Sequence, residues 1–292
     1  MPSNPPDDKF KGGSVAAFDQ SWAALPASNR YHFARQEPAH QVQFAFQNHF
    51  RVFRKVLGDV QSGRVLEVGS GRGSMAAFFA NAGFGAVLLD TSRPALDLAR
   101  ANFRQDGLTG HPEIADALRL PHASGSFDAI VSIGLFEHFA DIAAPLHEQL
   151  RVLRPGGVFL GYVVPERTVS VQTLAAPVNG LLALEHRWRT RRDPRQAVPR
   201  KAPFYRNAYR ARDYLKILEG MGVAARGAFG MFPVPMVSHS PSFPFTPMAP
   251  AREQRLMGLW RALLQLNPLR PGGDPWTCPE DWGLAFLVWA KK

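Results

Sequence analysis

The residues best suited to hold a cofactor are three glycines at alternate positions: Gly69, Gly71 and Gly73. They follow an apolar run at 65–68, which only Glu67 interrupts, and they precede a helix-forming stretch. A glycine-rich turn between a strand and a helix lets the backbone approach a ligand closely. The dinucleotide fingerprint G-x-G-x-x-G has a third glycine where Ser74 stands here. The turn therefore predicts a nucleotide-like cofactor but does not identify it.

Acidic residues follow the next two predicted strands. Asp90 and Thr91 come after the apolar run at 86–89, and a carboxylate at this place can bind the hydroxyls of a ribose. Asp116 and Ala117 come after the next predicted strand. Both acids also have an explanation without a ligand. Asp90 could cap the helix that follows it, and Asp116 could be an ordinary loop acid.

A glutamate and a histidine, Glu137 and His138, follow the strand predicted at 127–132. An unperturbed histidine titrates near pH 6.5, so His138 can accept a proton at neutral pH. The alternative is that His138 only packs on the cofactor or caps a helix. Asp128 stands at the start of the same strand, away from the carboxyl end where ligands bind, and is predicted to be structural.

These residues need a frame that brings several strand ends together. Apolar strands at 65–68, 86–89, 127–132 and 158–163 alternate with helical segments. Alternation of this kind predicts an α/β fold with a parallel sheet and helices on both faces. In such a sheet ligands bind at the carboxyl ends of the strands. Except for Asp128, the residues above lie at those ends.

In this order and spacing, the motifs resemble those of the class I S-adenosylmethionine-dependent methyltransferases. The matching residues are 67–73, Asp90, Asp116, the strand at 127–128, 137–138 and the turn at 153–157. The resemblance is strong over 60–165 and loose over 208–292. It implies a doubly wound, mostly parallel, seven-stranded sheet with helices on both faces. The last two strands would form an antiparallel pair at the sheet edge, and the cofactor would be S-adenosyl-L-methionine.

The resemblance also assigns roles to single residues. The expected cofactor-binding residues are Glu67, Gly69, Ser70, Gly71, Asp90, Thr91, Asp116, Ala117, Gly134 and Leu135. Within this set the resemblance implies Glu67, Gly69 and Gly71 at the methionine end, Asp90 at the ribose, and Asp116 with Ala117 at the adenine. It implies Gly134, Leu135 and His138 near the sulfonium and the acceptor. His138 is the expected base, with Glu137 as a second candidate catalytic residue.

The chain divides into four predicted segments. They are an N-terminal tail and helical lid at 1–58, the cofactor-binding core at 59–164, an Arg-rich cap insert at 165–206, and the C-terminal part of the core at 207–292. Residues 16–57 are expected to be helical, with Tyr31, His32 and Phe33 as lid candidates. The alternative is that the aromatic residues of this segment only pack the helix on the sheet.

The positive charge is concentrated in one stretch. The net charge is +10, and ten Lys or Arg residues but only one acid, Asp193, lie between His186 and Arg212. A local basic insert over the ligand crevice indicates a small or medium-sized, possibly anionic, substrate, since Arg binds carboxylates and phosphates well. The expected substrate-binding residues are Tyr31, Trp188, Arg189 and Tyr205. An RNA or protein substrate for the basic insert is the alternative.

Several classes of protein do not fit the sequence. The one cysteine, Cys278, excludes an intramolecular disulfide, and no apolar run reaches the length of a membrane span. The polar, Pro-rich N-terminus does not resemble a signal peptide, so a cytoplasmic location is expected. No acid and histidine cluster suits a catalytic magnesium ion, and a metal-free reaction is expected. The oligomeric state is left open.

Three other functions stay open. Residues 130–139 locally resemble the corresponding segment of cyclopropane fatty acid synthases, although Ser70 replaces the cysteine of that family's first motif. An NAD-type oxidoreductase is disfavoured by the missing third glycine and by the turn at 153–157. A protein that binds the cofactor without catalysis is also compatible with the sequence.

Overall fold

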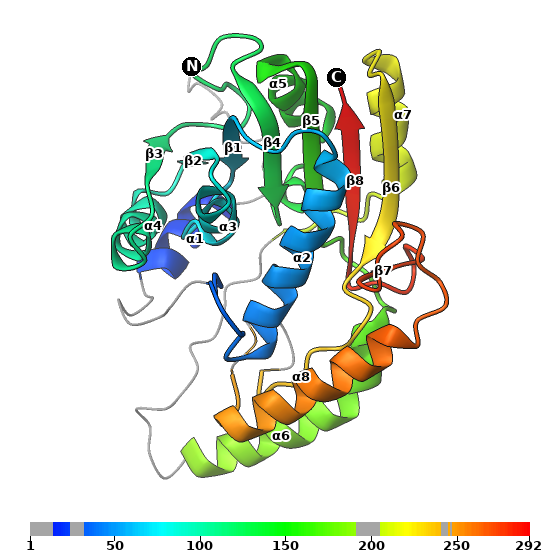
Figure 1. Ribbon diagram of the computed structural model, residues 1–292. Helices are drawn as coiled ribbons and strands as arrows, with labels where there is room; N and C mark the ends of the chain where they lie inside the picture. Colours follow the sequence, from blue (N-terminus) through cyan, green and yellow to red (C-terminus); the bar gives the residue numbers. More distant parts are fainter. Residues whose placement is uncertain (1–13, 24–31, 191–204, 241–244, 246) are drawn as a thin grey trace, which may run out of the picture.

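A computed structural model describes residues 14–23, 32–190, 205–240, 245 and 247–292, and its centre is one eight-stranded sheet (Figure 1). The strands are β1 (Arg64–Val68), β2 (Gly85–Asp90), β3 (Gly110–Ile114), β4 (Phe127–Ile133), β5 (Leu153–Val163), β6 (Ala225–Met231), β7 (Thr277–Cys278) and β8 (Ala285–Lys291). Their spatial order is β3-β2-β1-β4-β5-β8-β6-β7. β1 to β5 are mutually parallel, whereas β8 is antiparallel to both β5 and β6.

The predicted doubly wound, mostly parallel sheet is therefore confirmed. The eighth strand is the two-residue β7, which pairs with the end of β6 and which a pattern of alternating apolar residues cannot reveal. The antiparallel pair expected at the edge is β6 and β8. Within that pair β8 lies inside the sheet, between β5 and β6, and only β6 and β7 stand on the outer side.

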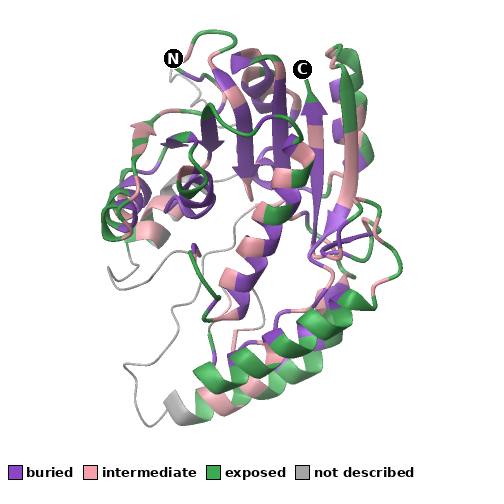
Figure 2. Ribbon diagram, viewed as in Figure 1, coloured by how far each residue is buried: buried purple, intermediate pink, exposed green. Residues whose placement is uncertain are grey.

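Two hydrophobic cores cover the two faces of the sheet. One contains buried side chains of α2 (Gln41–Leu57), α3 (Ser74–Asn81), α4 (Arg93–Gln105) and α8 (Pro250–Gln265). The other contains side chains of η1 (Phe136–His138), α5 (Ala143–Val152) and α7 (Ala211–Gly220). Figure 2 shows the central strands β1, β4, β5 and β8 mostly buried between these layers, whereas β3 and most of β6 are intermediate or exposed. Helices on both faces fix the strands, and with them the residues at the strand ends.

The N-terminal segment is less helical than the sequence analysis expected. In the described part of this segment, residues 14–23 and 32–58, the helices are α1 (Ser14–Ala23) and α2, and residues 32–40 are not helical. Pro38 is buried just before α2 begins, and a proline is tolerated at a helix start but not inside a helix. The His40 side chain caps α2 by accepting a hydrogen bond from the Gln43 backbone N–H.

The segment after β5 folds away from the sheet. It contains the short helix η2 (Val171–Ala175) and then α6 (Ala176–Thr190). In Figure 1, α6 and α8 lie beyond the sheet on the side toward which the arrowheads of β4 and β5 point. Both helices are mostly exposed in Figure 2. Among the described residues, no helix combines the length and the apolar character that crossing a lipid bilayer requires.

Candidate functional site

A cavity of about 840 Å³ lies at the carboxyl ends of β1, β2 and β4. All ten predicted cofactor-binding residues line it, and so do Glu137 and His138. The sequence brings them together because each follows a parallel strand that ends at the same edge of the sheet. Their individual contacts with a cofactor stay predictions.

The glycine-rich turn brings backbone to the cavity wall. The Gly69 and Ser70 N–H groups donate to the Leu89 carbonyl at 2.8 and 3.0 Å, which fixes the turn against the end of β2. Gly73 has a φ of +77°, and a Cβ placed there would lie 2.6 Å from Leu88 Cδ2. A side chain at this position would be strained and would clash. α3 begins directly after it.

Glu67 is a buried acid that points back from β1 to the start of α3. Its Oε2 accepts a hydrogen bond from the Ala76 N–H at 2.7 Å. Burial, helped by the nearby Asp90, raises the pKa of Glu67 to about 8, although hydrogen bonds from the backbone of α3 oppose that shift. Glu67 is 3% exposed, so it is not a solvated acid at the end of a strand.

Asp90 joins the end of β2 to the glycine-rich turn. Its Oδ2 accepts a hydrogen bond from the Gly71 N–H at 2.8 Å, and its Oδ1 accepts one from the Ser92 N–H at 2.9 Å. Burial raises the pKa of Asp90 from its usual value, against these hydrogen bonds. The cap of α4 is Ser92, whose side chain accepts from the Ala95 N–H. Asp90 is therefore not the helix cap that the sequence allowed.

Glu137 is a buried acid with an unsatisfied oxygen in the cavity wall. It is 1% exposed, and within the described part of the chain its Oε2 has no hydrogen-bond partner. Burial raises the pKa of Glu137 to about 7, while Arg206 opposes the shift. An unpaired buried carboxyl oxygen is costly in a native fold unless something else uses it. A ligand in the cavity can supply the missing donor.

His138 has a fixed hydrogen-bond partner on one ring nitrogen. Its Nδ1 lies 2.7 Å from the Tyr205 carbonyl oxygen. A carbonyl only accepts, so Nδ1 carries the proton, and in the neutral ring the lone pair is on Nε2. The Phe18 ring packs edge-on at 4.9 Å between centroids. This tautomer is the one that a base acting through Nε2 requires.

Asn207 holds the loop that carries Glu137 and His138, and the sequence analysis did not identify it. Its Nδ2 donates to the carbonyls of Phe136 and Phe139, each at 2.8 Å, and its N–H donates to the Glu137 carbonyl at 2.6 Å. The side chain is buried. A single asparagine after a basic stretch has no pattern that would have revealed this role.

Aromatic and apolar side chains form the rest of the cavity wall. They include Phe18 and Trp22 of α1, Phe46 and His49 of α2, Tyr162 of β5, and Phe232, Met236 and Leu284. The aromatic residues of the first segment were expected either to form a lid or to pack the helix on the sheet, and in the fold some line the cavity while others pack in the core. Phe46 and His32 line the cavity, whereas Phe33 packs on Phe78. Nothing in their spacing distinguishes the two groups.

Arg72 is a buried cation at the same wall. Its Nη2 lies 3.0 Å from His32 Nε2, and its guanidinium lies 5.7 Å from the Trp22 ring centroid. Burial lowers the pKa of Arg72 to about 10, and burial together with Arg72 lowers the pKa of His32 well below its usual range. His32 is therefore neutral at physiological pH.

The predicted substrate-binding residues are only partly described. Tyr31 and the side chain of Arg189 lie outside the described residues. Trp188 is 59% exposed and is not among the residues that line the cavity. The backbone carbonyl of Tyr205 contacts the His138 ring at the site. Their contacts with a substrate stay predictions. Asp128 is structural as predicted, since it accepts from the Arg64 N–H and from Arg154 Nε.

Comparison with known families agrees with the geometry of the cavity. Residues 65–157 match a family model described as a methyltransferase domain. The fold is similar to that of the YcgJ protein from Bacillus subtilis, with a TM-score of 0.53, 19% identity, and 84% of this chain and 98% of that chain covered. At this identity the similarity shows the fold alone.

Curated relatives share the same part of the chain. The methyltransferase GfsG of Streptomyces halstedii is 41% identical over 103 residues, which is 34% of this chain and 37% of the relative. A demethylmenaquinone methyltransferase of Thermus thermophilus is 38% identical over 96 residues, 32% of this chain and 44% of the relative. A ubiquinone biosynthesis O-methyltransferase of Paramagnetospirillum magneticum is 28% identical over 130 residues, which is 44% of this chain and 51% of the relative. The chain thus spans about half or less of the length of these relatives.

Proposed function

We propose that this chain, which carries a class I S-adenosylmethionine-dependent methyltransferase domain, transfers a methyl group to a small or medium-sized acceptor with a flat, mainly apolar body. The observation that carries the proposal is a cavity whose described lining has a polar part and an aromatic part. The polar part includes the glycine-rich turn, Glu67 and Asp90, and the aromatic part includes Phe46 and Phe232.

The polar side of the cavity fits S-adenosyl-L-methionine. The Trp22 ring packs directly on the glycine-rich turn, since a Cβ at Gly71 would lie only 2.9 Å from that ring. Asp90 would hold the ribose hydroxyls, and Asp116 would lie at the adenine. When bound, the cofactor supplies a sulfonium-activated methyl group. The chain has to align the acceptor with that methyl group and to exclude water.

The aromatic side of the cavity supports the class of acceptor. Phe46, Phe232 and Met236 offer apolar surface to a ring, and buried polar groups are few and specific there, as in many ligand sites. Two of the relatives are named as a demethylmenaquinone methyltransferase and a ubiquinone biosynthesis O-methyltransferase, and these names refer to compounds with a ring. We extend this class of acceptor to the present chain.

A base is needed if the acceptor atom carries a proton. The His138 tautomer leaves Nε2 as the basic nitrogen of the neutral ring, which supports His138 in that role. Glu137 has an unpartnered Oε2 and a pKa near 7, so it could take the same proton. The predicted anionic character of the substrate depends mainly on arginines outside the described residues. Of those described at the cavity, Arg167 already pairs with Glu280 at 2.7 Å.

Calorimetric titration with S-adenosyl-L-methionine tests the proposal, with NADH in parallel. We expect binding of S-adenosyl-L-methionine and not of NADH. Asp90→Ala should weaken that binding at least about tenfold, since charged hydrogen bonds to the ligand are lost. Asp97→Ala is the matched control, because Asp97 is an exposed acid of α4 that pairs only with Arg100 in the described structure. Equal loss in both variants, or binding of NADH alone, would contradict the proposal.

A further inference from the structure

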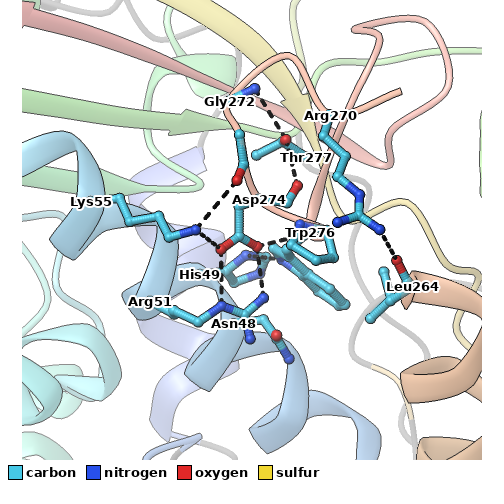
Figure 3. Close-up of polar contacts among 12 residues, drawn as sticks. Asn48, His49, Arg51, Lys55, Leu264, Arg270, Gly272, Asp274, Trp276 and Thr277 are labelled. Atoms are coloured by element: carbon cyan, nitrogen blue, oxygen red, sulfur yellow. Dashed lines mark hydrogen bonds and ion pairs between the residues drawn. The ribbon is translucent and has the colours of Figure 1, made fainter. Parts of the chain in front are cut away.

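His49 of α2 is a buried histidine in the aromatic wall of the cavity. The Trp276 indole Nε1–H donates to His49 Nδ1 at 2.9 Å. Figure 3 shows both rings at the end of a series of contacts that runs from α2 to the segment before β7. His49 is 2% exposed and Trp276 is fully buried.

The indole that fixes His49 is itself fixed through Asp274, a buried acid that pairs with two half-exposed cations. Asp274 Oδ1 accepts from the Trp276 backbone N–H at 2.9 Å. The same carboxylate binds Arg51 Nη2 and Lys55 Nζ, each at 2.7 Å, and these residues follow His49 by two and six positions in α2. Because these cations come from α2, the helix that carries His49 also holds the indole against it.

This arrangement determines where the imidazole carries its proton. An indole nitrogen only donates, so Nδ1 of His49 is an acceptor and the neutral ring has its proton on Nε2. Burial lowers the pKa of His49 to about 3, so the ring is neutral under physiological conditions. Within the described residues, the Nε2–H has no hydrogen-bond acceptor. The Nε2 atom is nevertheless not completely enclosed by protein. It therefore adjoins open space, and the space that the ring lines is the cavity.

Tyr162 provides a second neutral donor next to the first. Its ring centroid lies 4.5 Å from that of His49, and it also lines the cavity from the end of β5. Burial and nearby Glu137 raise the pKa of Tyr162 well above its usual value, so the hydroxyl keeps its proton. The surrounding rings are apolar, with Phe232 at 5.5 Å and Phe46 at 5.7 Å from the imidazole.

We propose that His49 and Tyr162 form a subsite that binds a neutral carbonyl oxygen on the ring of the acceptor, as in an aryl ketone whose nucleophilic atom lies elsewhere in the molecule. The proposal rests on the proposed function and specifies its substrate class. Two neutral donors in an apolar wall suit a carbonyl, which needs donors but brings no charge to bury. In this scheme Trp276 is a positioning residue, since it acts on the substrate only through His49.

The test compares two inert probes that differ by one oxygen, 1-tetralone and tetralin. Their dissociation constants are measured by calorimetry with and without S-adenosylhomocysteine. We expect the ratio of tetralone to tetralin affinity to fall about five- to tenfold in His49→Phe, the loss typical of one buried hydrogen bond. Tyr162→Phe, which removes a single oxygen, should have a similar effect. The control Phe46→Leu should weaken both probes alike and leave the ratio unchanged.

A second measurement tests the positioning role. Nitrogen-15 NMR of the imidazole should show a single tautomer with the proton on Nε2 in the native protein. Trp276→Phe should give a mixture of the two His49 tautomers. It should also lower the ratio of tetralone to tetralin affinity, but less than His49→Phe does. An unchanged ratio in both His49→Phe and Tyr162→Phe, or a proton on Nδ1, would overturn the subsite. Because the probes can be titrated without cofactor, that result is separate from a failure to bind S-adenosyl-L-methionine, which would refute the proposed function.

Discussion

Glu137 shows how a site residue can oppose the stability of its own fold. The carboxyl group is buried, and Oε2 has no partner among the described residues. Its pKa of about 7 in the folded protein compares with about 4.5 in an unfolded chain. The folded state therefore binds the proton of this acid more tightly than the unfolded chain does. The stability that this proton contributes to the fold is fully present below pH 4.5 and is lost as the pH rises through 7.

Glu137→Gln should consequently stabilise the protein at high pH. The amide stays neutral, so we expect little change at pH 4.5 and a gain that grows to at most about 3 kcal/mol above pH 7. Urea unfolding of the cofactor-free protein at pH 5 and pH 8 measures the difference. Glu219→Gln is the control, because Glu219 is largely exposed and pairs with Arg226 at the surface. A gain independent of pH would argue against a buried, unpaired carboxylate.

At the scale of single residues, the sequence was most informative where chemistry follows a strand end. Gly71 and Asp90 could be assigned because a strand and a turn precede each of them, and these patterns are local. His49 could not be assigned in this way, because its partner Trp276 is distant in the chain. A histidine on a helix carries no sign of the tautomer that a remote indole imposes on it.

The loop after β4 is a structural element that one side chain organises. Asn207 satisfies the carbonyls of Phe136 and Phe139 and also bonds the backbone of Glu137. The two catalytic candidates are in η1, a single turn of 3₁₀ helix that has little stability of its own. The position of Glu137 and His138 thus depends on a residue almost seventy positions later in the chain.

Asn207→Ala should damage both stability and the site. Two buried carbonyls lose their donor, for which we expect a loss of about 2 to 4 kcal/mol in the free energy of unfolding. Methyl transfer should fall more than binding of S-adenosyl-L-methionine, because the loop and not the glycine-rich turn is released. Asn81→Ala, at the exposed end of α3, should stay within about 0.5 kcal/mol of the native protein. Chemical denaturation and calorimetry provide the two measurements.

At the scale of elements, α2 explains why the sequence left the N-terminal segment ambiguous. Phe46, Phe50 and Phe53 recur at helical spacing, which indicates an apolar face but not what that face contacts. In the fold Phe50 packs on Phe78 and Phe79, whereas Phe46 lines the cavity. One helix serves the core and the site together, and periodicity cannot separate the two uses.

Over the whole molecule, Asp274 connects elements that are far apart in the chain. Its carboxylate is 1% exposed and binds two cations of α2 that are each about half exposed. These hydrogen-bonded cations lower the pKa of Asp274 to about 2, against the effect of burial. Because the pKa of Asp274 is lower in the folded protein than in the unfolded chain, the ionised carboxylate stabilises the fold at pH values above about 3.8, its unfolded pKa. This stabilisation is lost as the pH falls toward 2.

Asp274→Asn should therefore destabilise the protein most at neutral pH. We expect a loss of about 1 to 2 kcal/mol, reduced from the full linkage value because solvent screens Arg51 and Lys55. The difference from the native protein should diminish between pH 4 and pH 2. Thermal or urea unfolding across that range measures it. Asp97→Asn, which removes an exposed ion pair of α4, should show almost no effect at any pH.

The family resemblance led us to expect an antiparallel pair of strands at the sheet edge, but local pattern alone does not give the order of the strands. β8 pairs with β5 along Val158–Val163 and with β6 along Ala225–Met231, and neither pairing leaves a local signal in the sequence. The inner position of β8 has a consequence for synthesis. On the ribosome, β1 to β5 and every predicted cofactor residue emerge long before residues 285–291. Until then β5 has an open edge, which is a template for pairing with other chains. A premature stop before residue 285 would thus yield a chain with all its cofactor residues and a strong tendency to aggregate.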